Sequence, residues 1–100
     1  MHVVKVTGEF DVAAVDGFHV QAGAPDAELV VVDLREATFL DSYALTAIVE
    51  LHERLRGAGR SLAVLRPNGY ADRIFKLTGM DAQLPLYDER VPVLAQFNYG

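Results

Sequence analysis

The sequence predicts an α/β fold with a mainly parallel sheet. Segments of strand and helix character alternate along its 100 residues with short connections, which is typical of parallel strands joined by helical crossovers. Residues 29–32 form a continuous apolar run, and residues 62–65 form another. Such runs are expected of strands that are covered on both faces. No linker or repeat divides the chain, so we expect one domain over residues 1–100.

The first strand–helix pair is marked by β-branched residues and a capping aspartate. Residues 3–7 favour a strand, which Gly8 is expected to end. Asp11 is then suited to cap a short helix, because its carboxylate can accept a hydrogen bond from a free N–H of the first turn. Gly23 and Pro25 are expected to end this helix.

The second pair contains the longest predicted helix. The strand leads through residues 38–40 into Asp41 and Ser42, which are both good N-cap residues. Apolar residues then recur at helical spacing. On the outer side of this helix Glu50 precedes Arg54 by four residues, which is the favourable order for an ion pair.

The remaining segments predict one more helix between two strands. Residues 61–65 favour a strand, and Asn68 is suited to cap a helix that Gly79 ends. Residues 84–86 favour a short strand at an edge, because the proline within them lacks an N–H for the ladder. The proline in residues 88–100 limits how early a helix can begin there.

Composition excludes several classes of function. The chain has 9 basic and 14 acidic residues, a net charge of −5, so it lacks the basic face that binding to nucleic acid or anionic lipid requires. It has no cysteine, which excludes disulfides and thiolate metal sites. We find no signal peptide and no apolar run long enough for a membrane helix. We therefore expect a cytoplasmic protein that does not insert into membranes.

Enzyme motifs are missing from the sequence. Neither GxGxxG nor GxxxxGK[ST] occurs, so no phosphate-binding loop of these types is predicted. Ser42 lacks the flanking glycines of a nucleophile elbow. The histidines are too scattered for a metal site, and they are His2, His19 and His52. We predict no enzyme, no catalytic residue, no metal ligand and no cofactor.

One enzymatic alternative involves three carboxylates. Asp11, Asp33 and Asp41 all fall near strand–helix junctions, and a parallel sheet would gather such residues at one end. They could then hold Mg²⁺ or act as acid and base. The favoured interpretation is capping, since aspartate at a helix start satisfies free N–H groups and meets the positive end of the helix dipole.

Ser42 has a second interpretation besides capping. A hydroxyl at a helix N-terminus lies among free backbone N–H groups. A phosphate on that hydroxyl would be favoured by these donors and by the helix dipole. Phosphorylation of Ser42 would therefore add charge without unfolding the domain.

Four segments in order resemble the motifs of STAS domains, and among these the bacterial anti-sigma factor antagonists. TGEFD is similar to the family's GELD segment, and VVVDL followed by TFLDS is similar to its signature strand and DS(S/T)G motif. The later strand and helix end also match. The segments are residues 7–11, 30–42, 57–65 and 77–81.

The resemblance implies a STAS-type βα superhelix, with a mostly parallel four-stranded sheet and helices mainly on one face. It implies an anti-sigma factor antagonist that binds a kinase-type anti-sigma factor and so regulates sigma-factor-dependent transcription in a stress response. The anti-sigma factor is a serine kinase that would phosphorylate Ser42 and end binding, and a serine phosphatase would restore it. The implied partner-binding residues are Asp11, Asp41, Ser42, Tyr43 and Thr46.

Departures from the family pattern leave an alternative open. Tyr43 stands where the family has serine or threonine, and Ala44 where it has glycine. These would suit a STAS interaction subunit of a lipid-transporting ABC permease, or of a stress-signalling scaffold, in which Ser42 is not phosphorylated. In the family another strand commonly precedes the first strand seen here, and we expect this sequence to have no counterpart of it. The uncovered edge would favour self-association, and a homodimer is one state that this allows.

Overall fold

Strands and helices alternate along the chain, as the sequence predicts. The structure is a computed structural model that describes residues 1–23 and 27–87. Pro25 and the predicted tail at residues 88–100 lie outside the described residues. The elements are β1 (His2–Phe10), α1 (Val12–Gly23), β2 (Leu29–Leu40), α2 (Ser42–Gly57), β3 (Ser61–Leu65), α3 (Gly69–Thr78), the 3-10 helix η1 (Met80–Ala82) and β4 (Leu86–Tyr87).

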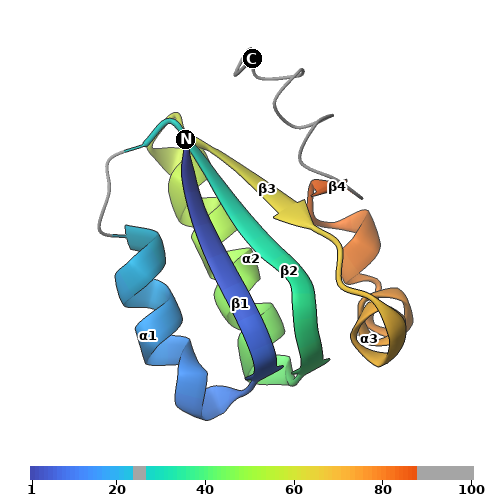
Figure 1. The fold of residues 1–100 in the computed structure, drawn as a ribbon. Helices are drawn as coiled ribbons and strands as arrows, with labels where there is room; N and C mark the ends of the chain where they lie inside the picture. The colour runs from blue at the N-terminus through green and yellow to red at the C-terminus, as the bar shows by residue number, and fades with distance from the viewer. Residues whose placement is uncertain (24–26, 88–100) are drawn as a thin grey trace.

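The four strands form one sheet in the order β1-β2-β3-β4, and every neighbouring pair is parallel. Figure 1 shows α2 behind β1 and β2, α1 on the outer side of β1, and α3 beyond β3. The predicted fold class, a four-stranded parallel sheet with helices mainly on one face, is confirmed. The short edge strand predicted at residues 84–86 is found slightly later, as β4 (Leu86–Tyr87), which begins just after Pro85 and lies at the edge of the sheet among the described residues.

Both faces of the central strands are buried, as the continuous apolar runs predict. On the face that the helices cover, alternate strand residues such as Val30, Val32 and Val64 join the main core. On the opposite face a smaller cluster contains Leu29, Val31, Ala63 and Leu65, and no helix in the described part of the chain contributes to it. Full burial of one such leucine or valine stabilises the fold by about 1.5–3 kcal/mol.

The first two strands are longer than the sequence predicts. The expectation that Gly8 ends β1 is wrong, because the strand continues to Phe10, which is 1% exposed. Gly8 adopts a φ of 69°, and the register with β2 shifts between Gly8 and Glu9. A glycine can adopt this conformation within a bulged ladder without ending it.

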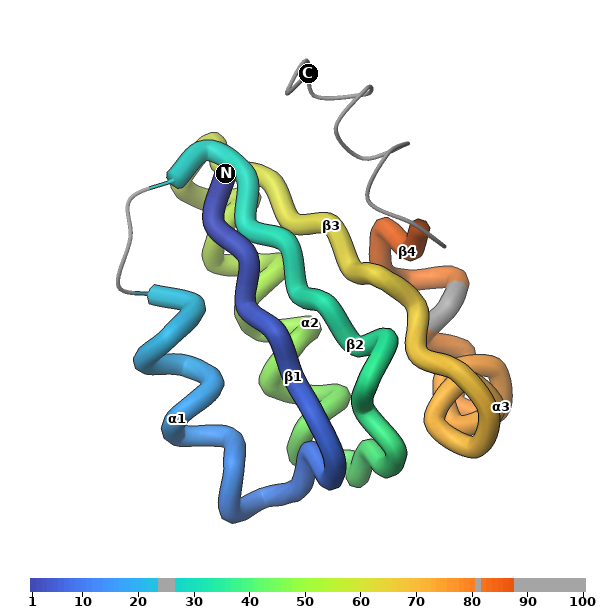
Figure 2. Tube along the Cα trace, viewed as in Figure 1, coloured from blue at the N-terminus to red at the C-terminus, as the bar shows by residue number. Residues whose placement is uncertain are grey.

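The second strand is longer than predicted, because it includes residues 38–40, which the sequence analysis placed between the strand and the next helix. β2 covers 12 residues without interruption, and its register with β1 shifts twice. Figure 2 shows β2 bending in its second half while it stays beside β1. Because of these shifts the 12-residue β2 stays paired with the 9-residue β1 up to Phe10 and Leu40. The two strands therefore end side by side, where α1 and α2 begin.

Candidate functional site

Asp41 joins the N-termini of the two parallel helices α1 and α2. It is the N-cap of α2, and its Oδ1 accepts a hydrogen bond from the backbone N–H of Ala44 at 2.9 Å. Its Oδ2 accepts from the backbone N–H of Val12, the first residue of α1, at 2.9 Å. Its own N–H donates to the carbonyl of Phe10 at 3.3 Å. One side chain therefore satisfies a free donor on each helix.

Asp11 is engaged in local capping beside it. Its Oδ1 accepts from the N–H of Ala13 at 3.1 Å, and its carbonyl accepts from the N–H of Ala14 at 3.0 Å. The capping interpretation of Asp11 and Asp41 thus agrees with their hydrogen bonds. Both carboxylates are turned toward backbone donors at the start of a helix.

Asp33 does not join them, so the three carboxylates form no common site. Asp33 is 4% exposed and forms a bidentate ion pair with Arg35. The Nε of Arg35 donates to Oδ1 of Asp33 at 3.0 Å, and its Nη2 donates to Oδ2 at 2.9 Å. It follows Leu29 and Val31 on the sheet face away from the main core. Within residues 1–23 and 27–87, no group of three or more potential ligands is placed to hold a metal ion. The idea of an Asp11–Asp33–Asp41 centre is therefore wrong.

The other predicted partner-binding residues lie at and just beyond the Asp41 junction. Ser42 is the first residue of α2 and is exposed, and Thr46 is exposed one turn further along. Tyr43 is 62% exposed, although large apolar rings are usually buried. A protein partner can therefore reach the hydroxyl of Ser42, the ring of Tyr43 and the hydroxyl of Thr46 together.

A pocket of about 290 Å³ lies between the two helices next to these residues. We call it the α1–α2 groove. It is lined by Val15 and His19 from α1, and by Ser42, Tyr43, Thr46, Ala47 and Glu50 from α2. The sequence reasoning missed Val15, His19, Ala47 and Glu50. Val15 and His19 are four residues apart, as are Thr46 and Glu50, and this spacing places each pair on one helix face. Ala47 likewise follows Tyr43 by four residues.

The predicted ion pair between Glu50 and Arg54 is not formed. A guanidinium nitrogen of Arg54 lies 3.4 Å from Nδ1 of His19, across the two helices. Glu50 is exposed and has no ion pair or hydrogen bond among the described residues. The packing of α1 beside α2 has given Arg54 a different neighbour, and it leaves the Glu50 carboxylate facing the groove.

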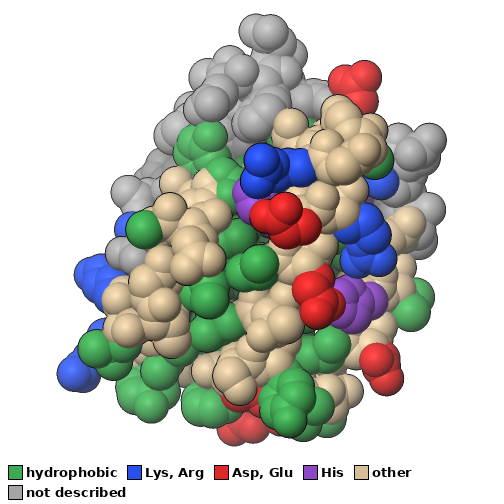
Figure 3. All heavy atoms as spheres, turned by 180° about the vertical axis from the view of Figure 1, so that it is seen from behind, with side chains coloured by type: hydrophobic (Ala, Val, Ile, Leu, Met, Phe, Trp, Pro, Cys, Tyr) green, Lys and Arg blue, Asp and Glu red, His purple; other side chains and the backbone are tan. Residues whose placement is uncertain are grey.

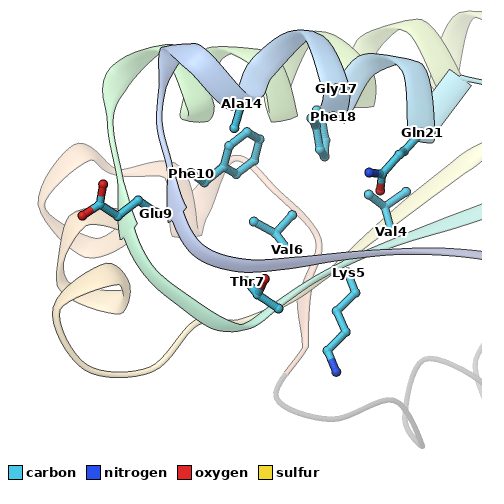
Figure 4. A pocket seen from close by; sticks show the side chains of 10 residues that line it. All are labelled: Val4, Lys5, Val6, Thr7, Glu9, Phe10, Ala14, Gly17, Phe18 and Gln21. Atoms are coloured by element: carbon cyan, nitrogen blue, oxygen red, sulfur yellow. The ribbon is translucent and has the colours of Figure 1, made fainter.

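A second pocket, of about 300 Å³, lies between the outer edge of β1 and α1. Figure 4 shows Val4, Val6, Phe10 and Phe18 in the space between the strand and the helix, while Lys5 extends away from the helix. In the described part of the chain β1 pairs only with β2. This pocket is therefore an apolar groove along an uncovered strand edge, and it does not include Ser42.

No helix in the described residues is both long and apolar enough to cross a membrane.

The site thus lies on a four-stranded parallel sheet backed by helices, with a capping aspartate and an exposed serine at the start of α2. The family model described as "Mlab, STAS domain" matches residues 1–88. The chain therefore belongs to the STAS domain family, which confirms the resemblance seen in its motifs.

Comparisons with individual proteins agree with this class. The chain is 26% identical to an anti-sigma F factor antagonist of Paenibacillus polymyxa, over 94% of this chain and 84% of that protein. An anti-sigma factor antagonist of Mycobacterium paratuberculosis has a similar crystal structure, with a TM-score of 0.80 and 31% identity over 94% of this chain and 82% of that one. Both relatives are named as anti-sigma factor antagonists.

A third comparison concerns the fold alone. The structure of the anti-sigma factor antagonist SpoIIAA in its unphosphorylated form matches with a TM-score of 0.76, over 96% of this chain and 87% of that one. Its sequence identity is 15%.

Proposed function

We propose that the protein is an anti-sigma factor antagonist that binds a kinase-type anti-sigma factor and is switched off by phosphorylation of Ser42. The names of its relatives at 26% and 31% identity support the class. The observation that carries the switch is the exposure of Ser42 at the start of α2, beside the Asp41 junction. The binding surface consists of Asp11, Asp41, Ser42, Tyr43 and Thr46.

The proposed switch acts on the interface and leaves the fold intact. A phosphate adds about −1.5 to −2 charges at pH 7, close to the carboxylates of Asp41 and Asp11. An unpaired charge buried in an interface costs about 2–5 kcal/mol, or roughly 30- to 5,000-fold in affinity at about 1.4 kcal/mol per tenfold change. The helix dipole stabilises the phosphorylated form by only about 0.3–1 kcal/mol, which is too little to offset the loss of binding. Because this dipole interaction is favourable, α2 stays folded.

The proposed protein acts by binding and catalyses nothing itself. The anti-sigma factor supplies the kinase activity, and a serine phosphatase removes the phosphate. In the unmodified state the protein holds the anti-sigma factor and releases the sigma factor for transcription in the cytoplasm. Asp41 orients Ser42 by fixing the start of α2, and Asp11 stabilises the start of α1 next to it.

The test uses purified candidate serine-kinase anti-sigma factors from the same genome. We expect the wild type and Ser42→Ala to bind one of them with similar Kd, and Ser42→Asp to lose at least about 30-fold in affinity. Thr38→Asp is the matched control, because Thr38 is also exposed but lies on β2. Mass spectrometry after incubation with ATP should map one phosphate to Ser42. Equal binding by Ser42→Ala and Ser42→Asp would contradict the proposal.

The exposed ring of Tyr43 favours a second candidate function. A bulky side chain beside the acceptor hydroxyl suits an adaptor in which Ser42 is never modified, such as a subunit of a lipid-transporting ABC permease or a stress-signalling scaffold. Copurification with a permease complex, together with the absence of phosphate on Ser42 in cells, would favour this adaptor over the switch.

Self-association through β1 is a further part of the proposal. The strand leaves one edge uncovered in the described part of the chain, with an apolar groove beside it. Such an edge can pair with a second copy of the chain. Sedimentation equilibrium across a concentration series measures whether a homodimer forms.

A further inference from the structure

We infer that the α1–α2 groove receives an arginine side chain of the anti-sigma factor, and that Glu50 is the carboxylate that binds its guanidinium group. The identity of the partner rests on the proposed function. The recognition itself rests on the charge and shape of the groove.

The first step is the state of Glu50. The two carboxylates on the outer face of α2 are Glu50 and Glu53, and they differ in their partners. Glu53 lies 3.5 Å from the guanidinium of Arg56. Glu50 has no ion pair in the described part of the chain, because Arg54 contacts His19 instead. The groove therefore presents a carboxylate that has no direct ion-pair partner among the described residues.

The second step is the chemistry of the groove wall. Val15 and Ala47 give it an apolar part, and the hydroxyl of Thr46 is available to accept a hydrogen bond. An arginine has an apolar stem and a planar group of N–H donors, so it matches both parts. A carboxylate can accept two parallel hydrogen bonds from a guanidinium, which a lysine ammonium cannot reproduce.

The third step is size and charge. Pockets that bury small ligands measure about 300–1,000 Å³, so a groove of about 290 Å³ suits a single side chain rather than a cofactor. Figure 3 shows the helix-covered face, where acidic, basic and histidine side chains lie close together above an area of hydrophobic ones. The whole chain carries a net charge of −5, which favours a basic group on the partner.

The contact at Glu50 is separate from the modification at Ser42. The two residues are eight positions apart on α2, or about 12 Å at about 1.5 Å per residue. Effects at sites that are more than about 7–10 Å apart and share no interaction partner usually add. Loss of the Glu50 carboxylate should therefore weaken binding by the same factor whether residue 42 is serine or alanine.

The first experiment tests the groove without the partner. Nα-acetyl-arginine amide is titrated into the ¹⁵N-labelled chain and followed by NMR. We expect saturable shifts at the amides of Thr46, Ala47 and Glu50, which Glu50→Gln abolishes and Glu53→Gln retains. Shifts that are absent, or that Glu50→Gln leaves in place, would overturn the inference whether or not an anti-sigma factor has been found.

The second experiment measures Kd for the anti-sigma factor that binds the wild type. Glu50→Gln should weaken binding about tenfold or more, since a hydrogen bond to a charged group is lost. Glu53→Gln should change Kd by less than about twofold. Replacing the docking arginine of the partner by glutamate should restore affinity to Glu50→Arg and not to Glu53→Arg.

The outcomes separate the two proposals. If Ser42→Asp abolishes binding while Glu50→Gln and Glu53→Gln bind alike, the groove inference is wrong and the switch stands. If Ser42→Asp binds normally while Glu50→Gln does not, the switch is wrong and the groove is a docking site. Circular dichroism of each variant establishes that it is folded.

Discussion

The carboxylate of Asp41 accepts a hydrogen bond from the backbone N–H of Val12 at 2.9 Å, although the two residues are 29 positions apart. The other oxygen of the same carboxylate caps α2 through Ala44. The surface around Ser42 is thus held by one group that belongs to both helices. The link joins the starts of α1 and α2, the two helices that form the walls of the α1–α2 groove.

Asp41→Ala should lower the free energy of unfolding by about 1–3 kcal/mol, because a lost N-cap costs about 0.5–2 kcal/mol and two helix ends lose their acceptor. Asp11→Ala is the matched control, since its side chain caps only the N–H of Ala13. Urea unfolding of both variants measures the difference. Equal losses would mean that the bond to Val12 contributes nothing. Faster exchange of the Val12 amide in Asp41→Ala would locate the effect.

Ser42→Asp should change the free energy of unfolding by less than about 1 kcal/mol, because an acidic group in the first turn interacts favourably with the helix dipole by about 0.3–1 kcal/mol. The nearby carboxylates of Asp41 and Asp11 oppose this gain. Thermal unfolding followed by circular dichroism measures the shift. A large destabilisation would show that any loss of binding comes from unfolding rather than from the interface.

Much of the fold follows from local signals in the sequence. The third strand is predicted at residues 61–65 and found at Ser61–Leu65. The predicted stop at Gly79 is found as a left-handed residue with φ of 75°. These features depend on residues close to one another in sequence. The lengths of β1 and β2 do not, because the register shifts between Lys5 and Thr7 and between Gly8 and Glu9 depend on pairing between distant segments.

The site was predictable only in part, for the same reason. The motif around Ser42 is local, and the resemblance to STAS domains brings in Asp11. The groove is not local, because its walls come from α1 and α2, which are far apart in the sequence and meet only in the folded chain. The predicted ion pair between Glu50 and Arg54 rests on their spacing of four residues along one helix. That spacing takes no account of His19 on the neighbouring helix, which Arg54 contacts instead.

Tyr43→Ala should weaken binding to the anti-sigma factor by tenfold or more, since exposed tyrosines are frequent anchors in interfaces. The matched control is Tyr70→Ala, because Tyr70 is 58% exposed at the start of α3, compared with 62% for Tyr43. Tyr70 stacks on Phe39 with ring centroids 6.4 Å apart, so its loss should affect stability rather than binding. Isothermal titration calorimetry of both variants tests this, and similar losses of affinity would contradict the role of Tyr43.

Asp72 should make the stability of the domain depend on pH in the acid range. Its carboxylate lies 2.6 Å from Nε of Arg66 and 3.2 Å from Nζ of Lys76. The hydrogen bond from Arg66 lowers the pKa of Asp72 below its ordinary value of 3.8, and Lys76 lowers it further, while partial burial opposes both. The folded state therefore holds the charged form of Asp72 more strongly than the unfolded chain does.

The sign of the pH effect follows from this lowered pKa. Above the unfolded value of 3.8 the stabilisation is fully present, and it is lost as the pH falls through the lower folded value. Asp72→Asn should therefore lower the free energy of unfolding by about 1 kcal/mol or less at pH 7, and the difference from the wild type should shrink below about pH 4. Urea unfolding across a pH series measures both curves. A difference that is the same at pH 3 as at pH 7 would mean that the loss comes from the amide group that replaces the carboxylate and not from the missing charge of Asp72.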